Sequence, residues 1–551
     1  MTAWSSSSSD GSAGTYELTF AYRDEPAYAA AVESLVFDKV AAGIARRDPS
    51  LWGAEAEDEA SKRLAWVDLP EQSRPLVEPI ESLRAKLADQ GVDHVVLCGM
   101  GGSSLAPEVI TAAAGVALTV LDSSDPTSVR AALAEQLEAT VVVVSSKSGS
   151  TLETDSQRRV YEQAFRDAGI DPSDRIVVVT DPGSPLDQAS RKAGYQVFNA
   201  DPEVGGRYSA LTAFGLVPSG LAGADLTALL DQAAAIAPDL AADSVDNPGL
   251  RLGALLGVAA QQGVDKLVLA DADSGAPGFG DWAEQLVAES TGKHGTGILP
   301  VVVESMDAPN ARPSTYDSVV VALGSGHPLD ASPPASGWGA VVDAPLGAQM
   351  LLWEHATVVA GRVLGINPFD QPDVESAKSA ARGLLEDRSA APEPEFTEGA
   401  VKVRAAGGLR LDGVDTLAGA VEALLATLDT GRGYLAVTAY LDRGDSARLA
   451  DVRAALAART GRPTTFGWGP RFLHSTGQYH KGGPATGVYL QVTGDPAEDL
   501  DVPGRDFTFG EFIAAQAAGD AQVLADRGRP VLALHLTARA EGLDQLLEAL
   551  R

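Results

Sequence analysis

The chain has 551 residues, too many for one compact core, so two or three domains are expected. A hydrophobic content of 45% and a mean hydropathy of zero are typical of a soluble globular protein. The formal net charge of −33 argues against a nucleic-acid partner, because a polyanion would be repelled. The net negative charge does not exclude a small anionic substrate, since a local group of Lys and Arg side chains can bind an anion.

The cellular compartment is indicated by several absences in the sequence. Cys98 is the only cysteine, which excludes an internal disulfide and suits a reducing compartment, and no Cys/His cluster has zinc-ligand spacing. Residues 1–14 are Ser-rich and lack a basic region followed by an apolar run, so they predict a flexible tail and no signal peptide. No apolar stretch reaches the roughly 20 residues of a membrane-spanning helix. We therefore expect a cytoplasmic protein with no membrane partner.

The predicted elements begin with helices. Residues 28–87 have helical periodicity, so we expect a helical segment after the tail. The tail and the helical segment are assigned to an N-terminal region at residues 1–74, ahead of the first α/β domain. From residue 93, apolar runs rich in β-branched residues alternate with helical stretches, which predicts a parallel sheet covered on both faces. The expected strands are residues 94–98, 117–121, 140–144 and 175–179, within a first α/β domain at 75–240.

A second α/β domain is predicted at residues 241–390. Its expected strands are 266–270, 299–303 and 318–323, with a helix including 283–289 and a strongly apolar helix at 349–364. The Ala/Pro/Glu-rich run at 389–394 is typical of a linker. The fold class is therefore α/β, with two doubly wound parallel-sheet domains.

An α/β C-terminal extension is predicted at 391–551. Its expected strands are 434–440, 488–492 and 531–535, with helices around 416–428 and 447–460. The sequence leaves open whether residues 395–551 form a separate domain or complete the second sheet.

Two loops after predicted strands have the composition of phosphate sites. Residues 99–104 read Gly-Met-Gly-Gly-Ser-Ser, and residues 145–151 read Ser-Ser-Lys-Ser-Gly-Ser-Thr ahead of a helix start that contains Glu153. Backbone N–H groups, the positive end of a helix and hydroxyl donors together suit a phosphate monoester. Each loop alone also fits an ordinary helix cap, and the first lacks the G-x-G-x-x-G spacing of a dinucleotide site.

These loops and three later segments resemble the glucose-6-phosphate isomerase family. Residues 99–107 and 146–154 resemble its two phosphosugar-binding loops, and 204–209, 285–293 and 365–378 resemble three further signatures in family order. The resemblance implies sugar-isomerase domains that interconvert glucose 6-phosphate and fructose 6-phosphate, in glycolysis and gluconeogenesis, by ring opening and a cis-enediol intermediate. It implies a hexose phosphate substrate and no metal or organic cofactor. It also implies a homodimer, since a histidine crosses between subunits in this family.

The chemistry of that reaction can be matched to individual residues. Moving a proton between C2 and C1 requires a base, usually a carboxylate, and Glu289 fits. The enediolate needs a fixed positive charge, which Arg207 can supply, with the Gly206 backbone nearby by resemblance. Without the surrounding motifs these two residues would be a solvated glutamate and a surface arginine. The remaining residues assigned to substrate binding are Gly102, Ser103, Ser146, Lys147, Ser148, Thr151, Gln285 and Gln371.

Ring opening requires a further acid and base. Lys378 matches the family lysine at the ring oxygen. The histidine departs from the usual pattern, because none of the three in the expected interval, His294, His327 and His355, has matching surroundings; His355 fits a packed helix better.

A better histidine match lies downstream. His474, four residues before a glutamine and followed by a predicted strand, is similar to the family's histidine segment, and its position after Lys378 implies a rearranged order of elements. His480 is the reserve, and an incidental pair of histidines in a polar surface loop stays open. By resemblance, Glu153 would orient the histidine.

Two other functions are weighed against this one. An enzyme of the same chemistry that also accepts mannose 6-phosphate is not distinguished by the sequence. A non-catalytic phosphosugar sensor would need neither Glu289 nor Lys378 and would often carry a basic DNA-recognition segment. Both residues are present and no such segment is evident, which disfavours the sensor.

Overall fold

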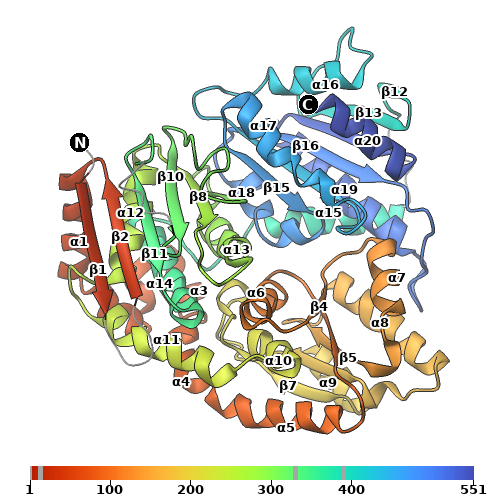
Figure 1. Ribbon diagram of the computed structural model, residues 1–551, viewed down its shortest axis with the longest axis horizontal. Coiled ribbons are helices and arrows are strands. Elements are labelled where there is room, and N and C mark those ends of the chain that lie inside the picture. Colours follow the sequence, from red (N-terminus) through yellow and green to blue (C-terminus); the bar gives the residue numbers. More distant parts are fainter. Residues whose placement is uncertain (1–2, 10–15, 327–332, 388–392, 551) are drawn as a thin grey trace.

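Three β-sheets organise the chain in the computed structural model, which describes residues 3–9, 16–326, 333–387 and 393–550. Each sheet with its helices forms an α/β unit, and Figure 1 shows the three units arranged around the centre of the molecule. The α/β class predicted from the sequence is confirmed. Most of the expected linker at 389–394, and also His327, lie outside the described residues.

The first sheet has the order β4-β3-β5-β6-β7, and all of its strand pairs are parallel. Its strands are β3 (His94–Gly99), β4 (Thr119–Leu121), β5 (Thr140–Ser145), β6 (Ile176–Thr180) and β7 (Gln196–Asn199). Alternate residues of β5 belong to different cores, Val141 and Val143 to one and Val142 and Val144 to the other. Because both faces are buried, the strands read as continuous apolar runs.

The second sheet has the order β1-β2-β11-β10-β8-β9. Its parallel strands are β8 (Lys266–Asp271), β9 (Leu299–Val303), β10 (Ser318–Leu323) and β11 (Gly339–Asp343). The N-terminal strands β1 (Ala3–Ser9) and β2 (Tyr16–Tyr22) complete it, β2 pairing antiparallel with β11. The expected flexible tail is therefore wrong for residues 3–9. Pairing at a sheet edge uses backbone N–H and C=O groups, so it does not need an apolar sequence.

The third sheet has the order β12-β13-β17-β16-β14-β15 and comes entirely from the C-terminal region. Its strands are β12 (Phe396–Glu398), β13 (Val401–Ala406), β14 (Tyr434–Tyr440), β15 (Thr464–Trp468), β16 (Gly487–Gly494) and β17 (Val531–Leu536). It has a core of its own, which includes Val403, Val437 and Leu534. The C-terminal region therefore forms a sheet of its own and does not complete the second one.

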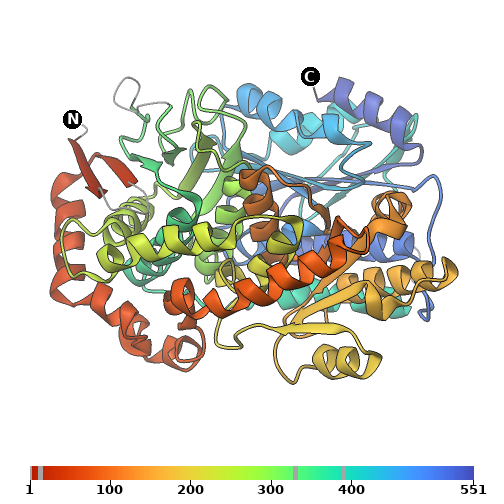
Figure 2. The same cartoon turned by 60° about the horizontal axis from the view of Figure 1, so that its bottom comes forward.

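The N-terminal helical segment is also present, and Figure 2 shows its red to orange helices along one side of the molecule. It comprises α1 (Glu25–Phe37), α2 (Val40–Ala45), α3 (Ala54–Ala60), α4 (Leu69–Gln72) and α5 (Val77–Ala88). The helices around the first sheet are α6 (Leu105–Ala114), α7 (Pro126–Ala134), α8 (Leu152–Asp167), α9 (Pro185–Ala193) and α10 (Ala213–Ala222). The core built on these helices continues into the second unit.

The remaining helices belong to the second and third units. In the second unit these are α11 (Leu226–Ala241), α12 (Pro248–Gln261), α13 (Phe279–Thr291) and α14 (Leu346–Leu364). In the third they are α15 (Val374–Asp387), which packs along α19, α16 (Leu417–Leu425), α17 (Val452–Thr460), α18 (Gly477–Gly482), α19 (Phe509–Asp526) and α20 (Arg539–Ala549). Across the described ranges, no helix has both the length and the apolar character needed to cross a bilayer.

Candidate active site

The two hydroxyl-rich loops lie side by side at one edge of the first sheet. They follow β3 and β5, which are adjacent and parallel, so their carboxyl ends meet at the same edge. The second loop leads into α8, and its hydroxyls are linked: Ser146 Oγ donates to Thr151 Oγ1 at 3.2 Å, and the Ser148 and Ser150 hydroxyls lie 2.7 Å apart. The loop thus presents hydroxyls around the N-terminus of a helix, where an anion is favoured.

Glycines in the first loop allow two other segments to approach it. A Cβ on Gly102 would overlap the carbonyl oxygen of Gly206, so the backbone carrying Arg207 can come this close only beside a glycine. Gly101 has φ +56°, and a Cβ there would lie 2.8 Å from Gln285 Nε2. The first phosphate loop is therefore packed directly against the Gly206 segment and α13.

Glu289 and Arg207 form a buried pair beside this junction. Arg207 Nε lies 3.3 Å from Glu289 Oε2, and the two residues are only 4% and 7% exposed. Burial raises the pKa of Glu289 above its ordinary value, although the charges of Arg207, His474 and Lys378 oppose the shift. A carboxyl whose pKa is raised is a stronger base and is suited to taking and returning a proton.

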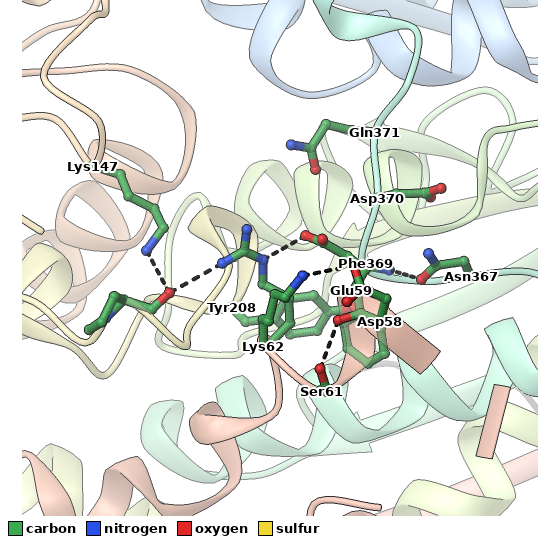
Figure 3. Close-up of polar contacts among 12 residues, drawn as sticks. Asp58, Glu59, Ser61, Lys62, Lys147, Tyr208, Asn367, Phe369, Asp370 and Gln371 are labelled. Atoms are coloured by element: carbon green, nitrogen blue, oxygen red, sulfur yellow. Dashed lines mark hydrogen bonds and ion pairs between the residues drawn. The ribbon is translucent and has the colours of Figure 1, made fainter. Parts of the chain in front are cut away.

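The segment after α14 closes the far side of Arg207. The guanidinium donates to the backbone carbonyl of Asp370 at 3.3 Å and to the side-chain amide oxygen of Gln371. Figure 3 shows Asp370 and Gln371 on this segment, with the Phe369 N–H donating to Asn367 Oδ1 at 2.9 Å. Gln371 thereby lies at the guanidinium of Arg207, as a residue at the sugar end of the site would.

Lys293 holds that segment in place and was not singled out in the sequence. Its Nζ donates at 2.7 Å to the carbonyl oxygens of both Asn367 and Asp370, and lies 2.5 Å from Asp370 Oδ1. Burial, with the charge of Arg207, lowers the pKa of Lys293 to about 8. Its sequence position after α13 gave no signal of this role, because the contacts reach more than seventy residues along the chain.

His474 lies in a short 3-10 helix, Arg471–His474, of the third unit, and the fold brings it to the second loop of the first unit. Its Nε2 is 3.3 Å from Glu153 Oε1, and the same oxygen accepts from Gln516 Nε2 at 2.8 Å. Burial favours the neutral carboxyl, but the hydrogen bond and charge of His474 outweigh it and lower the pKa of Glu153. The backbone carbonyl of His474 in turn accepts from Gln285 Nε2 at 2.8 Å.

A cavity of about 140 Å³ joins the phosphate loop to the proposed ring-opening residues. Its lining includes Ser148, Thr151, Glu153, Lys378, Arg382 and His474. The structure thus brings residues from three separate sequence segments to one space. Arg382 follows Lys378 by one turn of α15 and, like Gln516 on α19, was not predicted, since nothing in the sequence showed which face of either helix is turned toward this cavity.

The other histidines of the described residues lie elsewhere. His480 is buried in an aromatic cluster, with Nδ1 3.0 Å from Tyr434 Oη, and burial lowers its pKa to about 3. His355 is buried in α14 with its ring 4.9 Å from that of Trp66, as expected for a packed helix. His294 is exposed. Among the described histidines, His474 alone lines this cavity.

Lys147 is already engaged within the protein. Its Nζ lies 2.9 Å from Asp181 Oδ2 and 3.3 Å from the carbonyl oxygen of Pro202; Figure 3 shows Lys147 with one of its hydrogen bonds. Burial raises the pKa of Asp181, with Lys147 opposing the shift. Lys147 therefore stabilises the loop by its contacts with Asp181 and Pro202. Because its charge is paired with that of Asp181, its attraction for a phosphate is reduced.

Comparison with known proteins agrees with this arrangement. Residues 62–298 match the sequence profile of phosphoglucose isomerase. A probable glucose-6-phosphate isomerase of Natronomonas pharaonis is 33% identical over 339 residues, which cover 53% of this chain and 79% of the relative. The chain belongs to the phosphoglucose isomerase family. Its members in the comparison are named as isomerases, and the family resemblance drawn from the five motifs is confirmed.

Two solved structures share the fold. A hypothetical protein of Thermus thermophilus is 25% identical with a TM-score of 0.56, and the match covers 66% of this chain and 98% of that one. A glucose-6-phosphate isomerase of Chlamydia trachomatis has a TM-score of 0.54 at 21% identity, covering 68% and 90%. The match spans nearly the whole Thermus chain, whereas about a third of this phosphoglucose isomerase family member lies outside the match.

Proposed function

We propose that this protein is an aldose–ketose isomerase that interconverts glucose 6-phosphate and fructose 6-phosphate. The observation that carries the proposal is the buried Glu289–Arg207 pair, 3.3 Å apart and packed against a hydroxyl-rich loop at a helix N-terminus. A base, a cation and an anion site are the groups that this reaction needs. The name of the Natronomonas relative, a probable glucose-6-phosphate isomerase, supports the same substrate pair.

The phosphate anchors the substrate in this mechanism. Ser103, Ser146, Ser148 and Thr151 would donate hydroxyl hydrogen bonds, and the N-terminus of α8 adds backbone N–H groups and a favourable dipole. Binding energy gained at the phosphate can then orient the sugar carbons next to the catalytic residues. The reacting end of the sugar would extend toward Gln285 and Gln371.

Ring opening comes next. Lys378 would donate a proton to the ring oxygen while His474 accepts the proton of the C1 hydroxyl, so the C1–O5 bond breaks and a C1 carbonyl forms. The carboxylate of Glu153, 3.3 Å from His474 Nε2, orients the imidazole and stabilises its protonated form. Lys378 and His474 line the same cavity as the phosphate loop, which is the arrangement that ring opening requires.

Proton transfer completes the isomerisation. Glu289 would remove the proton from C2, and the electron pair forms the C1–C2 double bond of a cis-enediolate. The guanidinium of Arg207 and the backbone of Gly206 would stabilise the negative oxygen. Glu289 then returns the proton to C1, while the proton of the C2 hydroxyl passes to the oxygen on C1, so that C2 becomes the ketone and C1 carries the hydroxyl of fructose 6-phosphate.

Glu289→Gln tests this proposal. The amide keeps the shape of the side chain but cannot accept the C2 proton, so turnover should fall by roughly 10²–10⁴. A coupled assay of fructose 6-phosphate conversion measures the loss, and calorimetry with a sugar phosphate should show that binding persists.

The matched control is Glu78→Gln, an exposed glutamate of α5, which should leave turnover unchanged. Undiminished turnover in Glu289→Gln would exclude Glu289 as the base. Substrate preference is compared in the same assay with mannose 6-phosphate.

A further inference from the structure

The second and third units have the same strand topology. In the second sheet the order is β9-β8-β10-β11-β2-β1, and in the third it is β15-β14-β16-β17-β13-β12. In both, four parallel strands are followed by an antiparallel pair at one edge, and in both that pair precedes the four strands along the chain. Each strand of one unit therefore has a topological counterpart in the other.

The two units also meet through one pair of equivalent strands, because β15 lies against β9, its counterpart. Beside this pair α18 packs against α13, which is not its counterpart (Figure 1). Asn310, which follows β9, donates to the carbonyl oxygen of Arg462 at 3.0 Å, and its side-chain oxygen accepts from the N–H of Thr464 in β15 at 3.1 Å. A shared core joins the facing sheets, including Val301 and Val320 with Tyr434 and Tyr489. Contact between equivalent edge strands is one way in which a two-fold dimer interface forms, and here it is formed within one chain.

The catalytic groups are divided between these counterparts. Glu289 lies on α13, in the connection between the first two parallel strands of the second unit, whereas the matching connection of the third unit carries α17, whose sequence has no acidic residue. His474 lies in the connection from β15 to β16, whereas the matching residues 304–317 of the second unit contain no histidine. Each unit supplies what its counterpart lacks.

The third unit is firmly held at the site. Arg471 forms ion pairs of 2.7 Å with Asp122 and 2.5 Å with Glu108 of the first unit. Gln478, four residues past His474, contacts the second unit: its Nε2 donates to the carbonyl oxygen of Gly292 at 2.8 Å. These contacts flank His474 on both sides.

Lys378 depends on the third unit as well. Its helix α15 packs along α19, and at Gly519 the approach is so close that a Cβ would lie 2.8 Å from the backbone nitrogen of Ala381. Asp373, just before α15, accepts from Gln478 Nε2 at 2.8 Å and pairs with Arg527 at 2.7 Å. Both proposed ring-opening residues are thus positioned by the C-terminal unit.

From these observations we infer that the third unit is an internal counterpart of the second that takes the place of a partner subunit, so one chain carries one complete site with His474 supplied in cis. The inference rests on the proposed function for the roles of Glu289 and His474. The placement of the third unit on its own chain does not depend on those roles. A homodimer is then not required for activity.

Mixing two inactive variants tests the cis site. Glu289→Gln and His474→Ala chains with the same tag are co-expressed in equal amounts, purified together without separating mixed from unmixed oligomers, and assayed beside each variant expressed singly. A cis site predicts no activity above that of the single variants, whether or not mixed oligomers form. A site shared between chains would recover up to about a quarter of wild-type activity, since random pairing makes half the dimers mixed and each has one intact site. Such recovery overturns the inference.

A cross-link tests the same placement without using activity. Ser128 of the first unit and Asp442 of the third are joined at 2.7 Å, and Cys98 is buried, so Ser128→Cys with Asp442→Cys gives one reactive pair. A short bis-maleimide should join them within a chain, leaving a monomer band on a denaturing gel and a cross-linked peptide by mass spectrometry. A dimer band would place the third unit on another chain. Each single-cysteine variant is the control. Failure of Glu289→Gln to lower turnover would overturn the proposed base while leaving this readout intact.

Discussion

At the scale of single residues, burial decides which groups of the site can do chemistry. Glu289 and Glu153 are both buried carboxyls, yet the pKa of Glu289 is raised and that of Glu153 is lowered. The difference follows from partners: Glu153 accepts from His474 and Gln516, whereas burial dominates at Glu289. The environment thus suits Glu153, which stays ionised, to orienting His474, and suits Glu289 to proton transfer.

Arg382 is expected to contribute to phosphate binding. It lines the cavity with Ser148 and Thr151, where a guanidinium can form a charge-assisted hydrogen bond with a phosphate oxygen. Arg382→Ala should raise KM roughly 10-fold with little change in kcat, because the phosphate is bound equally throughout the reaction. Steady-state kinetics measure this. Arg410→Ala, at an exposed arginine of the third unit, should change neither constant, and an unchanged KM in Arg382→Ala would show that Arg382 faces solvent.

Glu284 is expected to make stability depend on pH. Burial, with Asp281, raises the pKa of this half-buried carboxyl to about 8, and its Oε1 accepts from Ser475 Oγ at 3.1 Å. The folded state holds a proton that the unfolded chain releases, so this stability is complete below the ordinary pKa of 4.5 and is lost as pH rises to about 8.

Glu284→Gln removes that titration and keeps an acceptor for Ser475. Relative to the unchanged protein, its free energy of unfolding should rise by about 1–2 kcal/mol between pH 5 and pH 8. Urea unfolding at both pH values measures the difference. Glu78→Gln on the exposed face of α5 should show none. A constant difference across the range would contradict the raised pKa.

At the scale of elements, the strands buried on both faces were the ones best predicted. β5, β8, β9, β10 and β14 coincide with or closely match the expected runs, because burial on both faces demands continuous apolar residues. Among the described residues, seven strands were not expected: β1, β2, β7, β11, β12, β13 and β15. Several of these lie at or near sheet edges and are short or mixed in composition, and backbone pairing alone leaves little trace in the sequence.

The packing of α15 on α19 should be sensitive to any side chain at Gly519. Gly519→Leu would force the helices apart at Ala381, one turn beyond Lys378, and should lower kcat and cost about 1–3 kcal/mol of stability. Turnover and thermal unfolding measure the two effects. Ala518→Leu adds the same side chain at an exposed position of the same helix and should be nearly neutral. Normal kcat in Gly519→Leu would mean that Lys378 does not depend on this contact.

At the scale of the whole molecule, three units converge on one site. The first unit carries the phosphate loops and Arg207, the second carries Glu289, and the third carries His474. Ion pairs between units, such as Arg471 with Asp122 and Arg462 with Asp317, are buried or nearly so, and the sheets of the second and third units share a core. An interface that combines buried ion pairs with an apolar core fixes the third unit in one orientation.

The sequence by itself determined the α/β class, the phosphate loops and the five family motifs, because these depend on local spacing and on strands that must be apolar along their length. Only the tertiary structure decided that residues 3–9 join the second sheet, that Lys293 secures the Asp370 segment, and that the C-terminal region forms a third unit beside its topological counterpart. It also decided which histidine meets Glu153, since that contact joins residues 321 positions apart. Such contacts arise from the packing of whole units, and no local pattern encodes how those units meet.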